Sequence, residues 1–148
     1  MIALDTNLLV YAHRAEMPLH DRARQVLNDL FAGRLAGREE VGIPWPCIHE
    51  FIGAVTHRRT WVMAHTMDQA FEAIGRMTAS PQTRLIGEGP SHLATVRGLA
   101  TASGIAGAQI HDARIAAICL SHGVRELWSC DRDFGRYPTL RVRNPLVG

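Results

Sequence analysis

The sequence predicts an α/β sandwich, in which helices cover both faces of a parallel β-sheet. The order of the elements favours this class, and the length of the chain favours a single domain. Short apolar runs alternate with amphipathic stretches along the chain, which is the pattern of strands joined by crossover helices. The 148 residues contain no repeat, low-complexity tract or linker, and they are enough to bury the core of one domain. We therefore expect a single domain over residues 1–148.

The first third of the chain is expected to hold one strand and two helices. Ile2–Leu4 is an apolar run that ends in the polar stretch Asp5–Asn7, which indicates a buried strand followed by a turn. A helix is then expected to begin near Leu8. The next helix is predicted over Leu19–Ala32, where apolar residues recur at helical spacing and Gly33 provides a stop.

The remaining two thirds continue the same alternation. Val41–Ile43 is an apolar run closed by Pro44, which indicates a short strand. Pro90 suits the first turn of a helix, so a helix is expected over Pro90–Ala102. The further elements expected, in order, are a helix at 47–56, a helix at 67–77, a strand at 83–86, a helix at 110–121, and strands at 126–130 and 140–143.

The composition is that of an ordinary soluble globule, with 47% hydrophobic and 20% charged residues. No apolar run approaches the roughly 20 residues that cross a bilayer, and the beginning MIALDTN lacks the basic segment of a signal peptide. We therefore expect a cytoplasmic protein without a membrane segment. The three cysteines, Cys47, Cys119 and Cys130, lie in apolar contexts and are expected to be free thiols.

All 16 basic residues are arginine, which excludes several kinds of chemistry. Without lysine the chain has no P-loop GK[ST] motif, no Schiff base and no lysine general base. Arginine suits phosphate recognition through its planar fork, although a net charge of +2 is too small to indicate a nucleic-acid partner by itself.

Acidic residues stand at the ends of the predicted elements. Asp5 follows the first strand and Asp131 follows the fourth, so both are expected at the carboxyl edge of the sheet, where open parallel sheets bind ligands. Asp112 lies in the first turn of the helix that feeds the fourth strand, which places it on the same side. Glu50 lies near the start of the helix after the second strand, a compatible position. Four carboxylates are therefore expected to meet at one edge.

Such a cluster is explained by a bound divalent cation. Carboxylate oxygens are the hard ligands that Mg²⁺ or Mn²⁺ prefers, and the cation offsets their mutual repulsion. Asn7 and Ser129 are neutral polar groups beside the acids that could orient ligands. Taken singly, each acid has a structural explanation: a polar turn at Asp5, a favourable helix dipole at Asp112, and an N-cap at Asp131. Their common position is what favours a site.

Four segments carry a resemblance to a known family. They are MIALDTNLLVYAHR, PCIHEFIGAVTHRR, IHDARIAAICLSHGV and LWSCDRDFGRYPTLRVRNPL, and in this order and spacing they resemble the PIN-domain ribonucleases, most closely the VapC toxins of bacterial toxin–antitoxin pairs. The resemblance covers almost the whole chain. It implies a three-layer sandwich around a five-stranded parallel sheet in the order 3-2-1-4-5. It also implies homodimers and inhibition by a VapB-type antitoxin.

The resemblance implies roles for the site residues as well. The family's four catalytic acids match Asp5, Glu50, Asp112 and Asp131, with Asp133 as a competitor for the last position. Asp5 and Asp112 would be the main metal ligands, and Asp131 and Glu50 would complete the metal site through waters. The residues that would support the site are Thr6, Asn7, Ser129 and Asp133.

The leading hypothesis is an Mg²⁺- or Mn²⁺-dependent endoribonuclease toxin that cleaves structured RNA, such as transfer or ribosomal RNA. The arginines near the acidic blocks are candidate phosphate contacts: Arg14, Arg58, Arg59, Arg132 and Arg136. A phosphatase with Asp5 as nucleophile is a second hypothesis, but the lysine of such sites is missing and Asn7 stands where they place a second aspartate. A catalytically silent RNA- or protein-binding module is the third.

Overall fold

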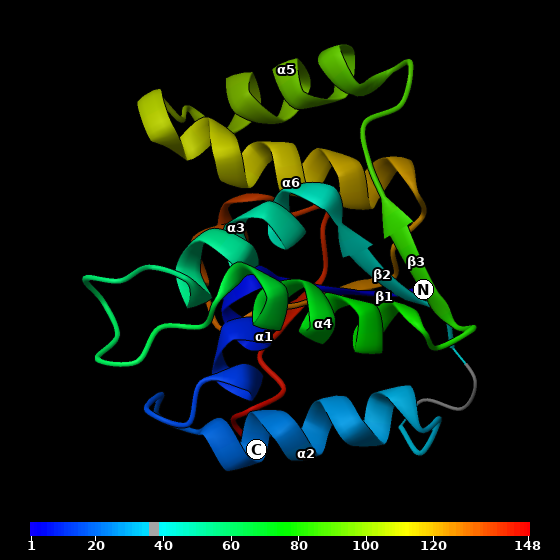
Figure 1. Ribbon diagram of the computed structural model, residues 1–148. Helices are drawn as coiled ribbons and strands as arrows, with labels where there is room; N and C mark the ends of the chain where they lie inside the picture. The colour runs from blue at the N-terminus through cyan, green and yellow to red at the C-terminus, as the bar shows by residue number, and fades with distance from the viewer. Residues whose placement is uncertain (36–38) are drawn as a thin grey trace.

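The computed structural model describes residues 1–35 and 39–148 and is a three-layer α/β sandwich. Its sheet has five parallel strands in the order β3-β2-β1-β4-β5, so the predicted fold class and strand order are confirmed (Figure 1). The strands are β1 Ile2–Leu4, β2 Val41–Pro44, β3 Thr83–Ile86, β4 Glu126–Trp128 and β5 Val142–Arg143.

The helices lie on both sides of this sheet. Figure 1 shows α5 and α6 together on one side, with α2 beyond α1 on the other. The helices are α1 Thr6–His13, α2 His20–Phe31, α3 Trp45–Val55, α4 Met67–Thr78, α5 His92–Ser103 and α6 Ile110–Ser121, with short 3-10 helices η1 Gly107–Gln109 and η2 Arg132–Arg136. Among the described residues, no helix is long and apolar enough to cross a membrane.

The core forms around the central strand β1. Its three residues are completely buried, since β2 and β4 flank it and helices cover both its faces. Leu8 and Leu9 of α1, and Ile115 and Ile118 of α6, are buried in the same apolar cluster. Burying each such side chain contributes about 1.5–3 kcal/mol, so the carboxyl end of β1 is held rigidly. All three cysteines are free thiols, as predicted.

Several predicted boundaries were wrong by two residues. The helix α3 begins at Trp45 rather than Cys47, because Pro46 occupies its first turn instead of closing the preceding strand. The strand β4 ends at Trp128 rather than Cys130, because the Cys130 N–H donates to the Asn7 side chain instead of a neighbouring strand. The strand β5 begins at Val142 rather than Leu140, because the Leu140 N–H bonds back to Tyr137 in a turn. The helix α5 begins at His92, since a turn in which His92 N–H bonds to the Gly89 carbonyl takes up Pro90.

The start of α1 also differs from the expected turn. The helix begins at Thr6, directly after β1, and Asp5 occupies the N-cap position. The Asp5 side chain makes no capping hydrogen bond, unlike most aspartates at this position. Its carboxylate is therefore available to other groups at the carboxyl edge of the sheet.

Candidate active site

A cavity of about 340 Å³ opens at the carboxyl edge of the sheet. Four acidic side chains from segments far apart in the sequence line it, which is the convergence that the sequence predicts. The polar lining consists of Asp5, Thr6, Asn7, Glu50, Asp112 and Asp131, and the less polar wall consists of Val10, Tyr11, Met17, Ala54 and Phe134.

Asp5 is the most deeply buried acid of the cavity, with 5% of its surface exposed. Its backbone N–H donates to the Trp128 carbonyl at 3.1 Å, which fixes it beside the end of β4. Its Oδ2 accepts a hydrogen bond from the Ser129 hydroxyl at 2.6 Å, and the Cys47 thiol lies 3.8 Å from Oδ1. Burial raises the pKa of Asp5 to about 6, and the Ser129 hydrogen bond opposes that rise. A buried carboxylate in this setting is stabilised by a nearby cation.

Asp112, Asp131 and Asp133 form the densest group of carboxylates in the described residues. One oxygen from each lies within 4.8 Å of the others. Burial raises the pKa of Asp112, and the charges of Asp131, Asp133 and Glu50 raise it further, while Arg136 lowers it. Asp5 is not one of this trio, although the charge of Asp112 helps to raise the pKa of Asp5 within the same cavity.

The geometry distinguishes Asp131 from Asp133. Asp131 lines the cavity, and its Oδ1 accepts the Asp133 N–H at 2.8 Å, so one of its oxygens caps η2. Asp133 is exposed and forms an ion pair with Arg136 at 3.4 Å. Asp131 is therefore the better placed of the two to act as the fourth acid of the cavity. It does so while it also serves as the N-cap of η2.

Neutral polar side chains connect the acids to one another. The Thr6 hydroxyl donates to Glu50 Oε2 at 2.6 Å, which brings the start of α1 to α3. The Ser129 hydroxyl accepts the Asp131 N–H at 2.9 Å while it donates to Asp5. Asn7 Oδ1 accepts the Cys130 N–H at 3.3 Å. Each neutral residue named from the sequence thus contacts an acid or the segment that carries one.

The predicted arginines fall into two groups. The structure corrects the predicted phosphate contact of Arg14, because its side chain is buried and its guanidinium contacts Glu16, Met63 and His65. It is not available to an RNA phosphate. The other arginines are exposed: Arg58 and Arg59 in the loop after α3, and Arg132 and Arg136 in η2.

Sequence reasoning did not identify the wall of the cavity. A signal for it exists, because Val10 is four residues after Thr6 and Tyr11 is four residues after Asn7, so each pair shares a face of α1. Ala54 is likewise four residues after Glu50 on α3. Helical spacing from each predicted polar residue would therefore have found three of the wall residues.

Fold and site together define a class of protein. Several carboxylates converge at the carboxyl edge of a parallel sheet, one of them buried, in a chain that has no lysine to neutralise them. Such a set of hard oxygen donors fits a divalent cation such as Mg²⁺ or Mn²⁺. The arrangement is typical of metal-dependent enzymes that hydrolyse phosphodiesters.

Comparisons with known proteins make the class specific. The PIN domain family matches residues 2–140. Ribonuclease VapC43 of Mycobacterium tuberculosis is 36% identical over 149 residues, which cover 100% of this chain and 97% of that protein. Ribonuclease VapC31 of the same organism is 33% identical over 147 residues, covering 99% and 100%. The chain therefore belongs to the PIN-domain family and, within it, to the VapC ribonucleases.

A solved structure agrees in fold. VapBC2 from Rickettsia felis, bound to a DNA fragment from its promoter, has a TM-score of 0.68 and 19% sequence identity, over 97% of this chain and 98% of that chain. At this identity the likeness concerns the fold. It supports the sheet order and the helical layers described above.

Proposed function

We propose that the protein is a metal-dependent endoribonuclease, formed by a single PIN domain over residues 1–148, that acts as the toxin of a VapBC-type pair in the cytoplasm. The observation that carries the proposal is the cavity that Asp5, Glu50, Asp112 and Asp131 line together. The names of its relatives, which are VapC ribonucleases, support the same activity. The substrate is structured RNA, for which transfer and ribosomal RNA are the leading candidates.

The donor set fits a divalent cation. Asp5, Asp112 and Asp131 would hold Mg²⁺ or Mn²⁺, and Glu50, which is exposed and tethered by Thr6, would act through waters. When bound, the cation lowers the pKa of an attacking water and stabilises the leaving oxygen of the phosphodiester. Ser129 holds the Asp5 carboxylate in one orientation through its hydrogen bond to Oδ2.

Exposed arginines that lie close in sequence to the acids would bind the RNA backbone. Arg132 immediately follows Asp131, and Arg58 and Arg59 follow the end of α3, which carries Glu50. Guanidinium groups bind phosphate through paired hydrogen bonds. A homodimer, and a VapB-type antitoxin that blocks the cavity, complete the proposal.

Two other functions fit less well. A phosphatase that forms a phosphoryl-Asp5 intermediate lacks the lysine of such sites, and Asp5 is already engaged by Ser129 and Cys47. Trapping of phosphate on Asp5 would support this alternative. A silent binding module would keep the cavity but show no turnover, and its interactions would be insensitive to a chelator.

The test is cleavage of RNA by the purified protein and by charge-neutral variants. Asp5→Asn and Asp112→Asn are expected to lower the Mg²⁺- or Mn²⁺-dependent rate by at least about a hundredfold, because each removes a negative ligand without changing its size. The exposed Asp68→Asn on α4 is the matched control and should cleave like the wild type. Sequencing of RNA 5′ ends after brief induction, wild type against Asp5→Asn, identifies the substrate. Undiminished cleavage by both site variants would refute the proposal.

A further inference from the structure

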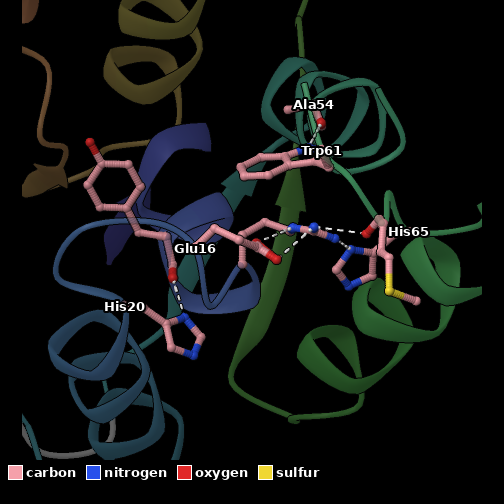
Figure 2. A network of polar contacts seen from close by, with 8 residues as sticks. Glu16, His20, Ala54, Trp61 and His65 are labelled. Carbon is pink, nitrogen blue, oxygen red and sulfur yellow. Dashed lines mark hydrogen bonds and ion pairs between the residues drawn. The ribbon is translucent and has the colours of Figure 1, made fainter. Parts of the chain in front are cut away.

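Arg14 lies at the end of α1 with its guanidinium enclosed by the protein. Only 4% of the residue is exposed. Its Nε and Nη2 donate to the two carboxylate oxygens of Glu16 at 3.0 Å each, and Nη2 also donates to the Met63 carbonyl at 2.9 Å. Nη1 contacts His65 Nδ1, and the Trp61 ring centroid lies 4.3 Å from Cζ. Figure 2 shows the labelled residues Glu16, Trp61 and His65 close to one another in this network of polar contacts.

Three of these partners belong to one loop, which spans residues 56–66 between α3 and α4. The tip of this loop does not pack on the core, since Val62 is fully exposed and Met63 is 82% exposed. Hydrogen bonds also tie the second half of the loop to the end of α3: Trp61 Nε1 donates to the Ala54 carbonyl at 2.7 Å, and His65 N donates to the Val55 carbonyl at 2.9 Å. Arg14 supplies the connection to α1.

The loop is connected to residues that line the acidic cavity. Ala54, which receives the Trp61 hydrogen bond, lines that cavity, and so does Met17, whose N–H donates to the Arg14 carbonyl at 3.0 Å. Arg58 and Arg59, both exposed, follow Ala54 by four and five residues. By holding this loop to α1, Arg14 helps to fix where the Arg58 and Arg59 guanidinium groups lie on a loop that begins two residues after the cavity-lining Ala54.

A buried arginine is a costly way to hold a loop. Removal of a guanidinium from water is unfavourable unless its donors are paired, and apolar residues of similar volume often give equal stability. Its advantage is geometric, because a planar fork satisfies a carboxylate, a carbonyl and a ring nitrogen at fixed angles. Such an arrangement selects one loop conformation, which apolar packing of an exposed tip would not.

We propose that Arg14 is a positioning residue for RNA binding. It holds the loop of residues 56–66 in the conformation in which Arg58 and Arg59 contact the phosphates that flank the cleaved bond. This inference rests on the proposed ribonuclease activity. Arg14 itself does not touch the RNA. Its contribution appears only through the two exposed arginines of the loop.

The first test follows the loop directly. Trypsin cleaves after arginine, so the initial rate of cleavage after Arg58 and Arg59 reports how firmly the loop is held. Arg14→Met keeps most of the side-chain volume and removes the donors, and it should speed cleavage in the loop by about tenfold or more. Trp61→Phe, which removes the bond to Ala54 and makes the ring over the Arg14 guanidinium smaller, is a milder second variant. The exposed Arg97→Gln on α5 is the control and should leave the loop sites unchanged.

The second test measures binding of fluorescein-labelled unfractionated transfer RNA in EDTA, where no cleavage occurs. The double variant Arg58→Gln/Arg59→Gln should reduce the slope of log affinity against log salt by about 0.9 for each phosphate that an arginine no longer neutralises. Arg14→Met should weaken binding by about tenfold in the wild-type background and by almost nothing in the double variant, because coupled residues are not additive. Arg97→Gln should reduce affinity far less than Arg14→Met.

Three results would overturn the inference: unchanged tryptic cleavage of the loop in Arg14→Met, decreases of RNA affinity that add in the triple variant, or no measurable RNA binding by the wild type. Should Arg14→Met not fold, Trp61→Phe answers the same questions. Mg²⁺-dependent RNA cleavage by the wild type is scored separately. Its absence would refute the proposed function, whereas its presence with a loop insensitive to Arg14 would refute the inference alone.

Discussion

The Ser129 hydroxyl donates a 2.6 Å hydrogen bond to Asp5 Oδ2 across the junction of two neighbouring strands. The same hydroxyl oxygen accepts the Asp131 N–H at 2.9 Å. One buried oxygen therefore connects two acids of the cavity, and it fixes which face of the Asp5 carboxylate is left for a cation. Mutation of a group that orients a metal ligand in this way typically lowers metal affinity or activity by about 10- to 100-fold.

Ser129→Ala is therefore expected to weaken metal binding without abolishing it. Loss of the hydrogen bond removes an interaction that lowers the pKa of Asp5, so the carboxylate becomes harder to ionise. Mn²⁺ affinity measured by calorimetry should fall by about 10- to 100-fold, and RNA cleavage should fall with it. Ser121→Ala, at an exposed position near the end of α6, is the control. Equal Mn²⁺ affinity in all three proteins would show that Ser129 does not orient the ligand.

The raised pKa of Asp5 predicts how the stability of the metal-free protein depends on pH. Its folded-state pKa of about 6 exceeds the ordinary value of 3.8, so the folded state binds the proton more tightly than the unfolded chain. The resulting stabilisation is complete below the unfolded pKa and is lost as the pH rises through about 6. A shift of about two units corresponds to about 3 kcal/mol.

Denaturant unfolding in EDTA between about pH 4 and pH 7 measures this loss. The wild type should lose up to about 3 kcal/mol more than Asp5→Asn over that range, because asparagine does not titrate. Addition of Mn²⁺ at neutral pH should restore stability to the wild type far more than to the variant. Parallel pH profiles for the two proteins would contradict the raised pKa.

The sequence predicts the site's acids because topology alone brings them together. Asp5 and Asp131 follow strands that prove to be neighbours in a parallel sheet, and the carboxyl ends of such strands share an edge. Asp112 follows by the same rule, since its helix leads into β4. No knowledge of side-chain conformation is needed for that step, so short-range pattern and chain order suffice.

Arg14 shows which contacts the sequence pattern cannot predict. Its partners Met63 and His65 are 49 and 51 residues further along the chain, and the contacts depend on the conformation of an irregular loop. An arginine close to an acidic block looks like a surface phosphate contact unless that loop is known to cover it. The predicted end of β4 was wrong for a similar reason. The Cys130 N–H donates its hydrogen bond to the side chain of Asn7, which is distant in sequence.

Tyr137 offers a test of stability at a residue that is not itself a proposed metal ligand. The residue is 1% exposed, and among the described residues its hydroxyl has no hydrogen-bond partner. A buried hydroxyl without a partner costs free energy of desolvation, so Tyr137→Phe should raise the free energy of unfolding by about 1 kcal/mol. Tyr137→Leu, which also removes ring packing, should lower it by about 2 kcal/mol. Urea unfolding of the metal-free proteins distinguishes these outcomes, and a destabilised Tyr137→Phe would reveal a partner for the hydroxyl.

The choice between Asp131 and Asp133 can be made with two isosteric variants. Asp131→Asn keeps the cap of η2, since asparagine caps helices as well as aspartate does, so the fold should persist while a negative charge leaves the cavity. Asp133→Asn breaks an exposed ion pair with Arg136, which contributes about 0–1 kcal/mol at most. Both proteins should therefore melt like the wild type in EDTA.

Their response to Mn²⁺ should differ, because only Asp131 lines the cavity. Asp131→Asn should lose most of the Mn²⁺-induced rise in melting temperature and about a hundredfold in RNA cleavage. Asp133→Asn should retain the rise and cleave within about tenfold of the wild type, because its carboxylate is already shared with Arg136. The reverse order would assign the fourth acid to Asp133, and equal losses would mean that both carboxylates of η2 hold the cation with Asp112.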